Sequence, residues 1–268
     1  MVAERGVVVP GVTGVALVTG AARGIGAATV AALAAEGWCV VAVDRAADDP
    51  RLPYPLGTLA ELEALRSPTV LPVVADVCDQ EALDAAVAEA ERVFGGLDVA
   101  IAVAGVVAGG VPLWEQPPEQ VEAVLDVNLK GVIHLARAAV PAMLRRPAPR
   151  QGRLLVVAST AAVRGLPMLA AYCAAKAGTT GLVRALAVEL AGTGITVNAV
   201  SPGSTDTMVL TESARLYGLP TSEGFARQQP LDRLVQPFEV AAALLWLAGP
   251  AAAAVTGAVL PVDGGLAL

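Results

Sequence analysis

Tyr172 and Lys176 are the two residues whose types and spacing most directly suggest chemistry. They stand four positions apart in a helical stretch, so their side chains project from one helix face. Free tyrosine titrates near pH ~10, and a cation fixed beside it favours the phenolate. We therefore expect the pair to accept a proton from an alcohol near neutral pH. The chain has only one other lysine, Lys130, so Lys176 is not one of many surface charges.

A glycine-rich turn at residues 19–26 follows an apolar, strand-like run and leads into a helical stretch. Strand, turn and helix in this order direct backbone N–H groups and the positive end of a helix toward a pyrophosphate. The glycines permit the tight turn and the close approach of a ligand. We therefore predict a dinucleotide site, with contacts from Gly20, Arg23, Gly24, Ile25 and Gly26.

An acidic residue, Asp44, ends the second strand-like run. A carboxylate at this place accepts hydrogen bonds from the adenosine ribose hydroxyls and repels a 2′-phosphate, which predicts NAD as the cofactor and not NADP. Arg23 and Arg45 point the other way, because either guanidinium can pair with a phosphate. Asp76 and Val77 end the third run and are placed to meet the adenine ring. The competing interpretation makes Asp76 a helix cap.

Apolar runs that suit strands alternate with helical patterns along the whole chain. This alternation is typical of βαβ units, in which helices cover both faces of a parallel sheet. We predict an α/β fold, a Rossmann-type three-layer αβα sandwich in one NAD-binding domain (residues 1–268), with about seven parallel strands in the order 3-2-1-4-5-6-7. The runs lie at residues 15–18, 40–43, 70–75, 99–103, 154–158, 196–200 and 258–262.

Two long segments depart from a minimal layout. Residues 46–68 are an insertion, stiffened by prolines, in which Thr58 and Glu61 have the spacing of a capping box and predict a short helix. Residues 204–230 are placed where a substrate lid can lie. The apolar side chains of this lid suit terpenoid, steroid or simple aliphatic alcohols equally, so the sequence names no substrate. They are Met208, Leu210, Leu216, Tyr217 and Phe225.

Composition and charge argue against several classes of partner. The net charge of −7 and the pI near 4.8 disfavour nucleic acid and anionic membranes, which need a clustered positive field. Cys39, Cys78 and Cys173 lack the spacing of metal ligands, and the single histidine, His134, excludes a multi-histidine site. We therefore expect no bound metal.

Residues 240–260 carry no charge, and a helix of this length would be long enough to span a bilayer. Gly249 and Pro250 interrupt this stretch, so we interpret it as a buried helix (238–247) followed by a buried strand (258–262). Residues 1–14 have mixed charge and lack the apolar core of a leader peptide. We expect a cytoplasmic protein.

In their order and spacing, these residues resemble the short-chain dehydrogenase/reductase family of the classical type. The resemblance spans nearly the whole chain, and its marks are individually modest but jointly specific. They are the Thr-Gly-x-x-x-Gly-x-Gly turn at 19–26, Asp76-Val77, Asn128, Ser159 thirteen residues before Tyr172, the Tyr-x-x-x-Lys motif at 172–176, Ser201-Pro202-Gly203 and the closing 262–265.

The resemblance implies a role for each of these residues. Tyr172 would be the general acid/base, and Lys176 would lower its pKa and bind the nicotinamide ribose. Ser159 would hold the substrate oxygen, and Asn128 would anchor a water that relays the proton. The family also implies self-association, commonly as a homotetramer. Further implied cofactor contacts are Ala104, Gly105, Tyr172, Pro202, Gly203, Thr205 and Thr207.

One mark of the family is degraded. Where members usually carry Asn-Asn-Ala-Gly, this chain has Ala-Val-Ala-Gly at residues 102–105. The sheet-stabilising asparagines are absent, so the hydrogen bonding of the fourth strand is in question. The backbone contacts of Ala104 and Gly105 to a cofactor do not depend on those side chains.

The insertion has a narrower likeness. Asp44-Arg45 followed by Tyr-Pro-Leu-Gly-Thr-Leu-Ala-Glu-Leu at 54–62 is similar to the insert of the mycofactocin-coupled branch of the family. That likeness implies a segment that covers the nicotinamide cofactor, NAD that stays bound between turnovers, and a peptide-derived redox cofactor as the external electron acceptor. The simpler interpretation is a longer surface loop.

We expect an NAD-dependent oxidoreductase that interconverts an alcohol with a ketone or aldehyde by hydride transfer. An NADPH-dependent ketoreductase of fatty-acid or polyketide type is the nearest alternative, and Asp44 disfavours it. An epimerase or dehydratase would need a larger C-terminal substrate domain. A dinucleotide-sensing protein without turnover would not need the Asn, Ser, Tyr and Lys set.

Overall fold

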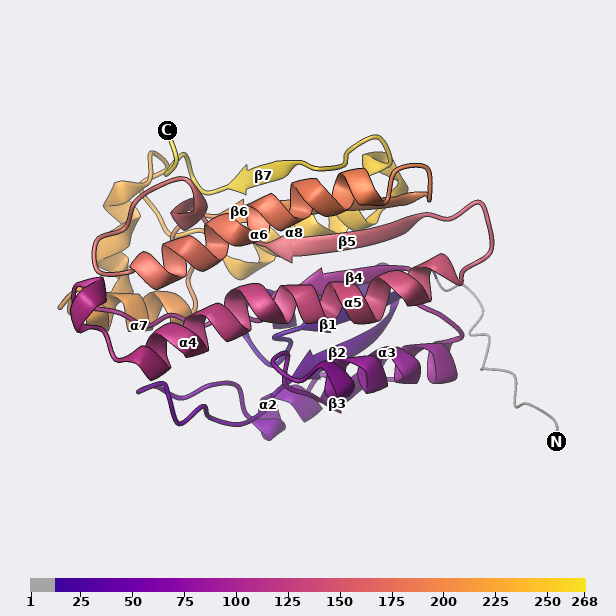
Figure 1. The fold of residues 1–268 in the computed structure, drawn as a ribbon, viewed down its shortest axis with the longest axis horizontal. Helices are drawn as coiled ribbons and strands as arrows, with labels where there is room; N and C mark the ends of the chain where they lie inside the picture. Colours follow the sequence, from indigo (N-terminus) through magenta and orange to yellow (C-terminus); the bar gives the residue numbers. More distant parts are fainter. Residues whose placement is uncertain (1–12) are drawn as a thin grey trace.

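Seven parallel strands form one sheet through the centre of the molecule (Figure 1). The computed structural model of the protein describes residues 13–268, so the expectation about a leader at residues 1–14 falls almost wholly outside the described part. The strand order is β3-β2-β1-β4-β5-β6-β7, which confirms the prediction. The strands are β1 (Val15–Thr19), β2 (Cys39–Asp44), β3 (Val70–Val74), β4 (Val99–Ala102), β5 (Gly152–Val157), β6 (Ile195–Pro202) and β7 (Val259–Val262).

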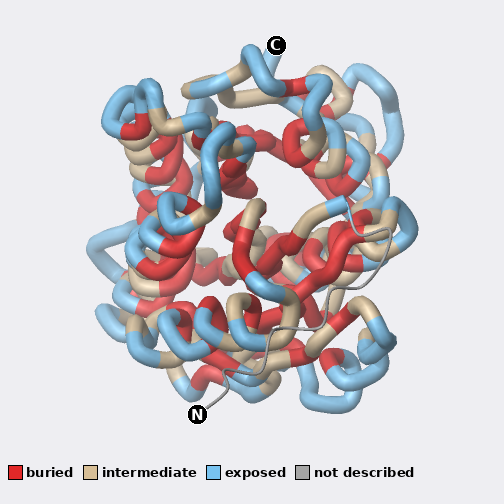
Figure 2. The backbone as a smooth tube through the Cα atoms, turned by 90° about the vertical axis from the view of Figure 1, so that its right-hand side faces the viewer, coloured by how far each residue is buried: buried red, intermediate tan, exposed pale blue. Residues whose placement is uncertain are grey.

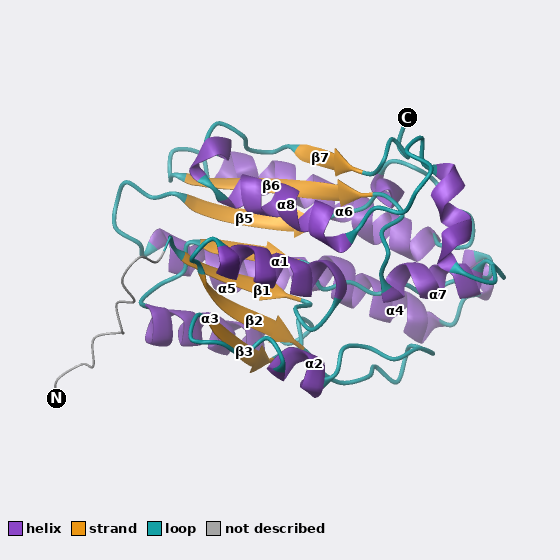
Figure 3. Ribbon diagram, turned by 180° about the vertical axis from the view of Figure 1, so that it is seen from behind, coloured by secondary structure: helices purple, strands orange, loops and turns teal. Residues whose placement is uncertain are grey.

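Helices cover both faces of the sheet, so that it is the middle layer of a three-layer sandwich (Figures 1 and 3). One face packs against α3, α4, α5 and α6, and the other packs against α1 and α8. The helices of these two layers are α1 (Gly24–Ala35), α3 (Gln80–Phe94), α4 (Pro118–Leu125), α5 (Gly131–Leu144), α6 (Ala170–Glu189) and α8 (Pro237–Ala248).

Each central strand is buried on both sides, because neighbouring side chains point to opposite faces of the sheet. Leu17 and Leu154 pack under α3 and α5, whereas Val18 and Leu155 pack under α1 and α8. The tube in Figure 2 shows this buried interior running through the molecule, with exposed residues on the outer turns. The continuous apolar runs of the sequence are therefore explained by two-sided burial.

Thr19, at the end of β1, supplies the hydrogen bonds that hold the end of β4. Its hydroxyl oxygen accepts from the backbone N–H of Val103 at 3.2 Å and of Ala104 at 3.3 Å, and its hydroxyl lies 3.5 Å from the carbonyl of Ile101. The backbone just after β4 therefore has hydrogen-bond partners although the family's asparagines are absent. A threonine of the glycine-rich turn ties β4 in place.

The charge-free stretch at 240–260 covers most of α8 and the start of β7, so the helix and the strand lie where we expected them. The expectation of a buried strand was wrong: β7 is the edge strand of the sheet, and its residues are partly buried or exposed. Within residues 13–268, no helix combines the length and apolarity that crossing a membrane requires.

The two additional segments each contain short helices. The insertion holds α2 (Leu59–Glu63), and the expected capping box is present: the Thr58 hydroxyl accepts from the Glu61 N–H, and the Glu61 carboxylate accepts from the Thr58 N–H. The segment proposed as a lid holds α7 (Met208–Leu216) and a 3-10 helix (Ser222–Gln228). Both segments lie at the end of the molecule where the strands terminate (Figure 1).

Candidate active site

A cavity of about 570 Å³ opens at the carboxyl ends of the strands. Parallel strands bring their carboxyl ends to one edge of the sheet, which is where ligands bind in open α/β folds. Every residue predicted for the site except Asn128 lines this cavity. Those residues are Gly20, Arg23, Gly24, Ile25, Gly26, Asp44, Arg45, Asp76, Val77, Ala104, Gly105, Ser159, Tyr172, Lys176, Pro202, Gly203, Thr205 and Thr207.

The N-terminus of α1 is suited to an anion. Arg23 is its N-cap but makes no side-chain cap hydrogen bond, and the first turn holds no acidic residue. The backbone N–H groups and the positive helix end are thus left for a ligand. Gly20 has φ +67°, and a Cβ there would lie 2.6 Å from the Cα of Ala104, so only glycine fits between these loops. These residues fit a dinucleotide pyrophosphate.

Asp44 is held by backbone donors at the end of β2. One carboxylate oxygen accepts from the Ala22 N–H at 3.0 Å and the other accepts from the Ala46 N–H at 2.9 Å. Gly57 of the insertion packs against the same carboxylate, because a Cβ at Gly57 would lie 3.1 Å from Asp44 Oδ1. The insertion therefore lies directly over the predicted ribose-binding residue.

Arg23 and Arg45, the two cations that argued for a 2′-phosphate, are engaged by the protein itself. Arg23 donates to the carbonyl of Pro55 at 2.8 Å. Arg45 donates to Asp49 at 2.9 Å and lies 3.5 Å from Asp76. A phosphate would have to compete with these partners, which weakens the case for NADP.

Asp76 is not a helix cap. Its Oδ1 accepts from the backbone N–H of Cys78 at 2.9 Å, while Asp79 caps α3 by accepting from the N–H groups of Glu81 and Ala82. Asp76 and Val77 both line the cavity. Their placement fits the predicted adenine contact.

Asn128 lies behind the cavity wall and has no exposed surface. It sits in a π-helical turn (Asp126–Lys130) between α4 and α5. Its Nδ2 donates to the carbonyls of Val106 and Val124, both at 2.8 Å, and its Oδ1 accepts from the Val106 N–H at 3.2 Å. Both amide protons are used, so Asn128 fixes the loop after β4. π-Helical turns of this kind are frequent at functional sites.

Ser159, Tyr172 and Lys176 meet at the inner end of the cavity. Ser159 follows β5, its oxygen accepts from the Ala161 N–H at 3.1 Å, and its hydroxyl also hydrogen-bonds Tyr172. Lys176 is 4% exposed, and its Nζ donates to the Val157 carbonyl at 2.9 Å and lies 5.8 Å from the Tyr172 ring centroid. The helical spacing thus holds phenol and ammonium side by side, as the sequence predicted.

The direction expected for the tyrosine pKa needs correction. Desolvation raises the pKa of Tyr172 above its ordinary value, and hydrogen bonding with Ser159 opposes this effect without overcoming it. Burial also lowers the pKa of Lys176, to about 8. The expectation counted the attraction between the two groups but omitted the cost of placing both in a poorly solvated site, which is larger here.

The lowered pKa of Lys176 predicts a pH dependence of folding. An unfolded lysine titrates near pH ~10.4, so between pH 8 and that value the unfolded chain holds a proton that the folded chain has released. The free energy of unfolding should rise by about 2–3 kcal/mol from pH 7 to pH 10, relative to the Lys176→Met variant measured in the same way. Urea unfolding at both pH values tests this. Parallel pH profiles of the two proteins would contradict it.

The part of the cavity wall that the lid supplies is mostly apolar. Met208, Leu210, Tyr217 and Phe225 of the lid line it as predicted, whereas Leu216 packs against Gly110 outside the lining. The sequence did not single out the remaining members of this wall, because they are ordinary apolar or polar residues from separate loops. They include Thr160, Arg164, Leu166, Leu169, Val209, Ser213, Leu219, Gln228 and Leu266.

Tyr54 of the insertion is a further lining residue that the sequence argument missed. It is 8% exposed, and its phenol oxygen accepts from the Val107 N–H at 2.9 Å. Burial raises the pKa of Tyr54, so the phenol stays protonated. The sequence did offer one indication that this loop packs against the rest of the protein: it holds one of only three tyrosines, between two prolines.

No group of three or more His, Cys, Asp and Glu side chains within residues 13–268 is arranged to hold a metal ion. The single histidine, His134, contacts the carbonyl of Val77 through Nδ1 at 2.9 Å.

Known proteins resemble this chain in both sequence and fold. A family model described as enoyl-(acyl carrier protein) reductase matches residues 20–267. A cis-4-hydroxycyclohexanecarboxylate dehydrogenase from Sinomonas cyclohexanicum is 39% identical, over 94% of this chain and 95% of the relative. A (−)-trans-carveol dehydrogenase from Rhodococcus erythropolis is 35% identical, over 95% of this chain and 97% of the relative.

A crystal structure of carveol dehydrogenase from Mycobacterium avium in complex with NAD superposes with a TM-score of 0.89, at 33% identity, over 96% of this chain and 98% of that one. These similarities run through the glycine-rich turn and the Tyr172–Lys176 pair alike, and they confirm the predicted enzyme class, an oxidoreductase. The chain belongs to the short-chain dehydrogenase/reductase family.

Proposed function

We propose that the protein is an NAD-dependent dehydrogenase that interconverts an alcohol with a ketone or aldehyde. The observation that carries the proposal is the single cavity in which Ser159, Tyr172 and Lys176 share walls with the glycine-rich turn and Asp44. A dinucleotide seated on the turn and an alcohol beside Tyr172 would occupy one enclosed space. Proximity of this kind is what hydride transfer needs.

Some residues of the site transfer the proton, and others position the substrate and the loops around it. The Ser159 hydroxyl, which lies beside Tyr172, orients the substrate oxygen, and Tyr172 accepts the proton as the alcohol is oxidised. Lys176, anchored on Val157, holds a positive charge beside the phenol below pH about 8. NAD, when bound, supplies the carbon that accepts the hydride. Asn128 keeps the loop after β4 in place, and the family resemblance adds a role in proton relay.

The cofactor is NAD because the carboxylate of Asp44 is fixed where the ribose hydroxyls must lie. Two backbone donors orient its oxygens, and the nearby arginines are already paired. The NAD complex of the carveol dehydrogenase supports this choice, since the two folds superpose over nearly their full length.

We further propose that the insertion (residues 46–68) closes over the bound NAD, and that a mycofactocin-type redox partner reoxidises it in place. Asp49, Tyr54, Leu56 and Gly57 of the insertion all line the cavity. Arg23 at the N-terminus of α1 also bonds the insertion through Pro55. A cofactor under this cover would exchange slowly with solution, so its electrons would leave through an external acceptor.

The experiment combines an alcohol panel with an artificial electron acceptor. Purified protein should carry NAD through dialysis, and oxidation of a cyclic or terpenoid alcohol should bleach the acceptor dye without added NAD. Adding NAD without the dye should give little bulk NADH. If turnover needs free NAD and releases NADH, the proposal of a dehydrogenase stands, but the proposal that NAD stays bound between turnovers is wrong. An absence of turnover with every alcohol and acceptor would contradict the proposed function.

The apolar wall near Tyr172 points to a substrate with a hydrocarbon body. The lid contributes Met208, Leu210, Tyr217 and Phe225, and the relatives named above act on cyclic alcohols. We propose cyclic aliphatic or terpenoid alcohols as the first substrates to screen. An NADPH-dependent ketoreductase is disfavoured by Asp44, because its carboxylate repels the 2′-phosphate of that cofactor.

The proposal also includes a cytoplasmic homotetramer. Exposed apolar side chains lie on two helices of one sheet face, which we propose as subunit contacts: Ile133 on α5 is 37% exposed, and Val188 on α6 is 76% exposed. Light scattering of purified protein measures the subunit number.

A further inference from the structure

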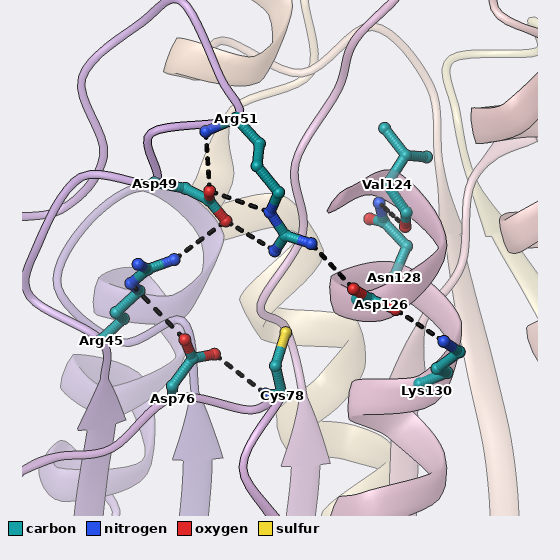
Figure 4. A network of polar contacts seen from close by, with 9 residues as sticks. All are labelled: Arg45, Asp49, Arg51, Asp76, Cys78, Val124, Asp126, Asn128 and Lys130. Carbon is teal, nitrogen blue, oxygen red and sulfur yellow. Dashed lines mark hydrogen bonds and ion pairs between the residues drawn. The ribbon is translucent and has the colours of Figure 1, made fainter. Parts of the chain in front are cut away.

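The insertion is fastened to the turn that carries Asn128. Arg51, within the insertion, donates through Nη1 to Asp126 at 2.8 Å, across 75 positions of sequence. Asp126 is the first residue of the π-helical turn, and Asn128 is the third. Figure 4 shows Arg51 reaching from the insertion to this turn. No element of the minimal fold makes this connection, because the insertion itself supplies the guanidinium.

Asp49 is the centre of the contact on the insertion side. It is 2% exposed, and its carboxylate accepts from Arg51 Nε at 3.0 Å, from Arg51 Nη2 at 2.8 Å and from the Arg51 backbone N–H at 3.0 Å. Arg45 donates to the same carboxylate at 2.9 Å and lies 3.5 Å from Asp76. Asp49, Arg45 and Asp76 all line the cavity.

The contact is stronger than an ordinary surface ion pair. One guanidinium uses three different N–H groups to bind two carboxylates, a geometry that only arginine offers. The side chains of Arg51 and Asp126 are 27% and 24% exposed, so water screens them only in part. Hydrogen bonding from Arg51 lowers the pKa of Asp49 to about 2, so the carboxylate is charged at neutral pH.

We propose that Asp49, Arg51 and Asp126 form a latch in which Arg51 is a positioning residue. It holds the insertion closed over the adenosine half of the cavity and fixes the turn that orients Asn128. Because Asn128 in turn bonds Val106, the latch connects the cover of the cofactor to the loop after β4. The role in cofactor retention rests on the proposed function, whereas the role in fixing the Asn128 turn does not.

The test compares Arg51→Met with Lys130→Met. Lys130 donates to the other oxygen of Asp126 at 2.8 Å and is 62% exposed, so its variant removes a charge from the same carboxylate but leaves the latch intact. Release of prebound NADH, followed by its fluorescence after dilution into excess NAD, should be at least ~10-fold faster in Arg51→Met. In Lys130→Met it should stay within about twofold of the wild type.

A second readout examines the turn without any ligand. Hydrogen–deuterium exchange of the peptide containing Val106 should be faster in Arg51→Met, because the Val106 N–H bonds Asn128 Oδ1. The Arg51→Met/Asp126→Asn double variant should behave like Arg51→Met alone, since both changes break one contact. Arg51→Lys should recover only part of the wild-type behaviour, because an ammonium cannot fork to both carboxylates.

These experiments test the latch and the proposed dehydrogenase function independently. If wild-type protein binds no NADH, the proposed function fails, and the exchange experiment still decides whether Arg51 fixes the turn. Unchanged NADH release together with unchanged exchange in Arg51→Met would overturn the latch. Equal effects of Arg51→Met and Lys130→Met would overturn it as well, because a general loss of charge at Asp126 would then explain them.

Discussion

Replacing Tyr172 with Phe should lower kcat by at least ~100-fold, which is the usual contribution of a positioned general acid or base. The phenyl ring keeps the shape of the side chain but removes the hydroxyl beside Ser159 that exchanges a proton with the alcohol oxygen. The hydroxyl makes no hydrogen bond to the dinucleotide-binding turn, so the affinity for NAD should change by less than about threefold. The expected result is a loss in kcat with an almost unchanged dissociation constant for NAD.

Tyr217→Phe is the matched control. Tyr217 lines the same cavity, but its hydroxyl donates to the carbonyl of Pro167 at 2.7 Å on the lid side. Removing this hydroxyl should alter KM for an apolar alcohol and leave kcat within about fivefold of the wild type. Steady-state rates with the dye acceptor and calorimetric NAD binding measure both variants. Near-normal turnover by Tyr172→Phe would refute the assignment of the proton acceptor.

The sequence was sufficient to predict the layers and the strand order because the apolar runs are long and each lies between two helices. The two-sided burial of β1, β2, β4 and β5 leaves few other arrangements for a chain of this length. The capping box at Thr58 fixed the start of α2 for a local reason, since both of its hydrogen bonds lie within four residues.

Contacts between distant segments were harder to predict. The Thr19 hydroxyl accepts hydrogen bonds from the backbone just after β4 across more than eighty positions, and Arg51 reaches Asp126 across 75. Neither pairing leaves a periodic pattern in the sequence, because each depends on how loops from two different βαβ units fold over the same sheet edge. Tyr54 was missed for the same reason, since its partner is a backbone N–H in another loop.

The pKa of Tyr172 shows a different limit of sequence reasoning. Four-residue spacing correctly placed Lys176 next to the phenol, but spacing carries no information on solvation. The structure shows that Lys176 is 4% exposed and turned toward the Val157 carbonyl. In such a site the cost of burying a charge competes with the attraction between charges, and its size follows only from three-dimensional packing.

The choice between NAD and NADP is predicted to depend on the charge of Asp44. The Asp44→Asn variant keeps the shape of the side chain but removes the negative charge that repels a 2′-phosphate and accepts from ribose hydroxyls. Hydrogen bonds to charged groups contribute about 1.5–3 kcal/mol each, so affinity for NAD should fall at least ~10-fold. Affinity for NADP should rise, and the preference for NAD over NADP should fall by about 100-fold.

Asp48→Asn separates this effect from a disturbance of the insertion. Asp48 lies four residues further along, and its Oδ1 accepts from the Leu56 N–H at 2.8 Å, so the variant loosens the same segment without touching the ribose site. It should speed the release of both cofactors equally and leave the ratio of their affinities unchanged. Titration of NADH and NADPH fluorescence with wild type, Asp44→Asn and Asp48→Asn gives the three ratios. A wild type that prefers NADPH, or an Asp44→Asn variant that still excludes it, would show that the charge of Asp44 does not select the cofactor.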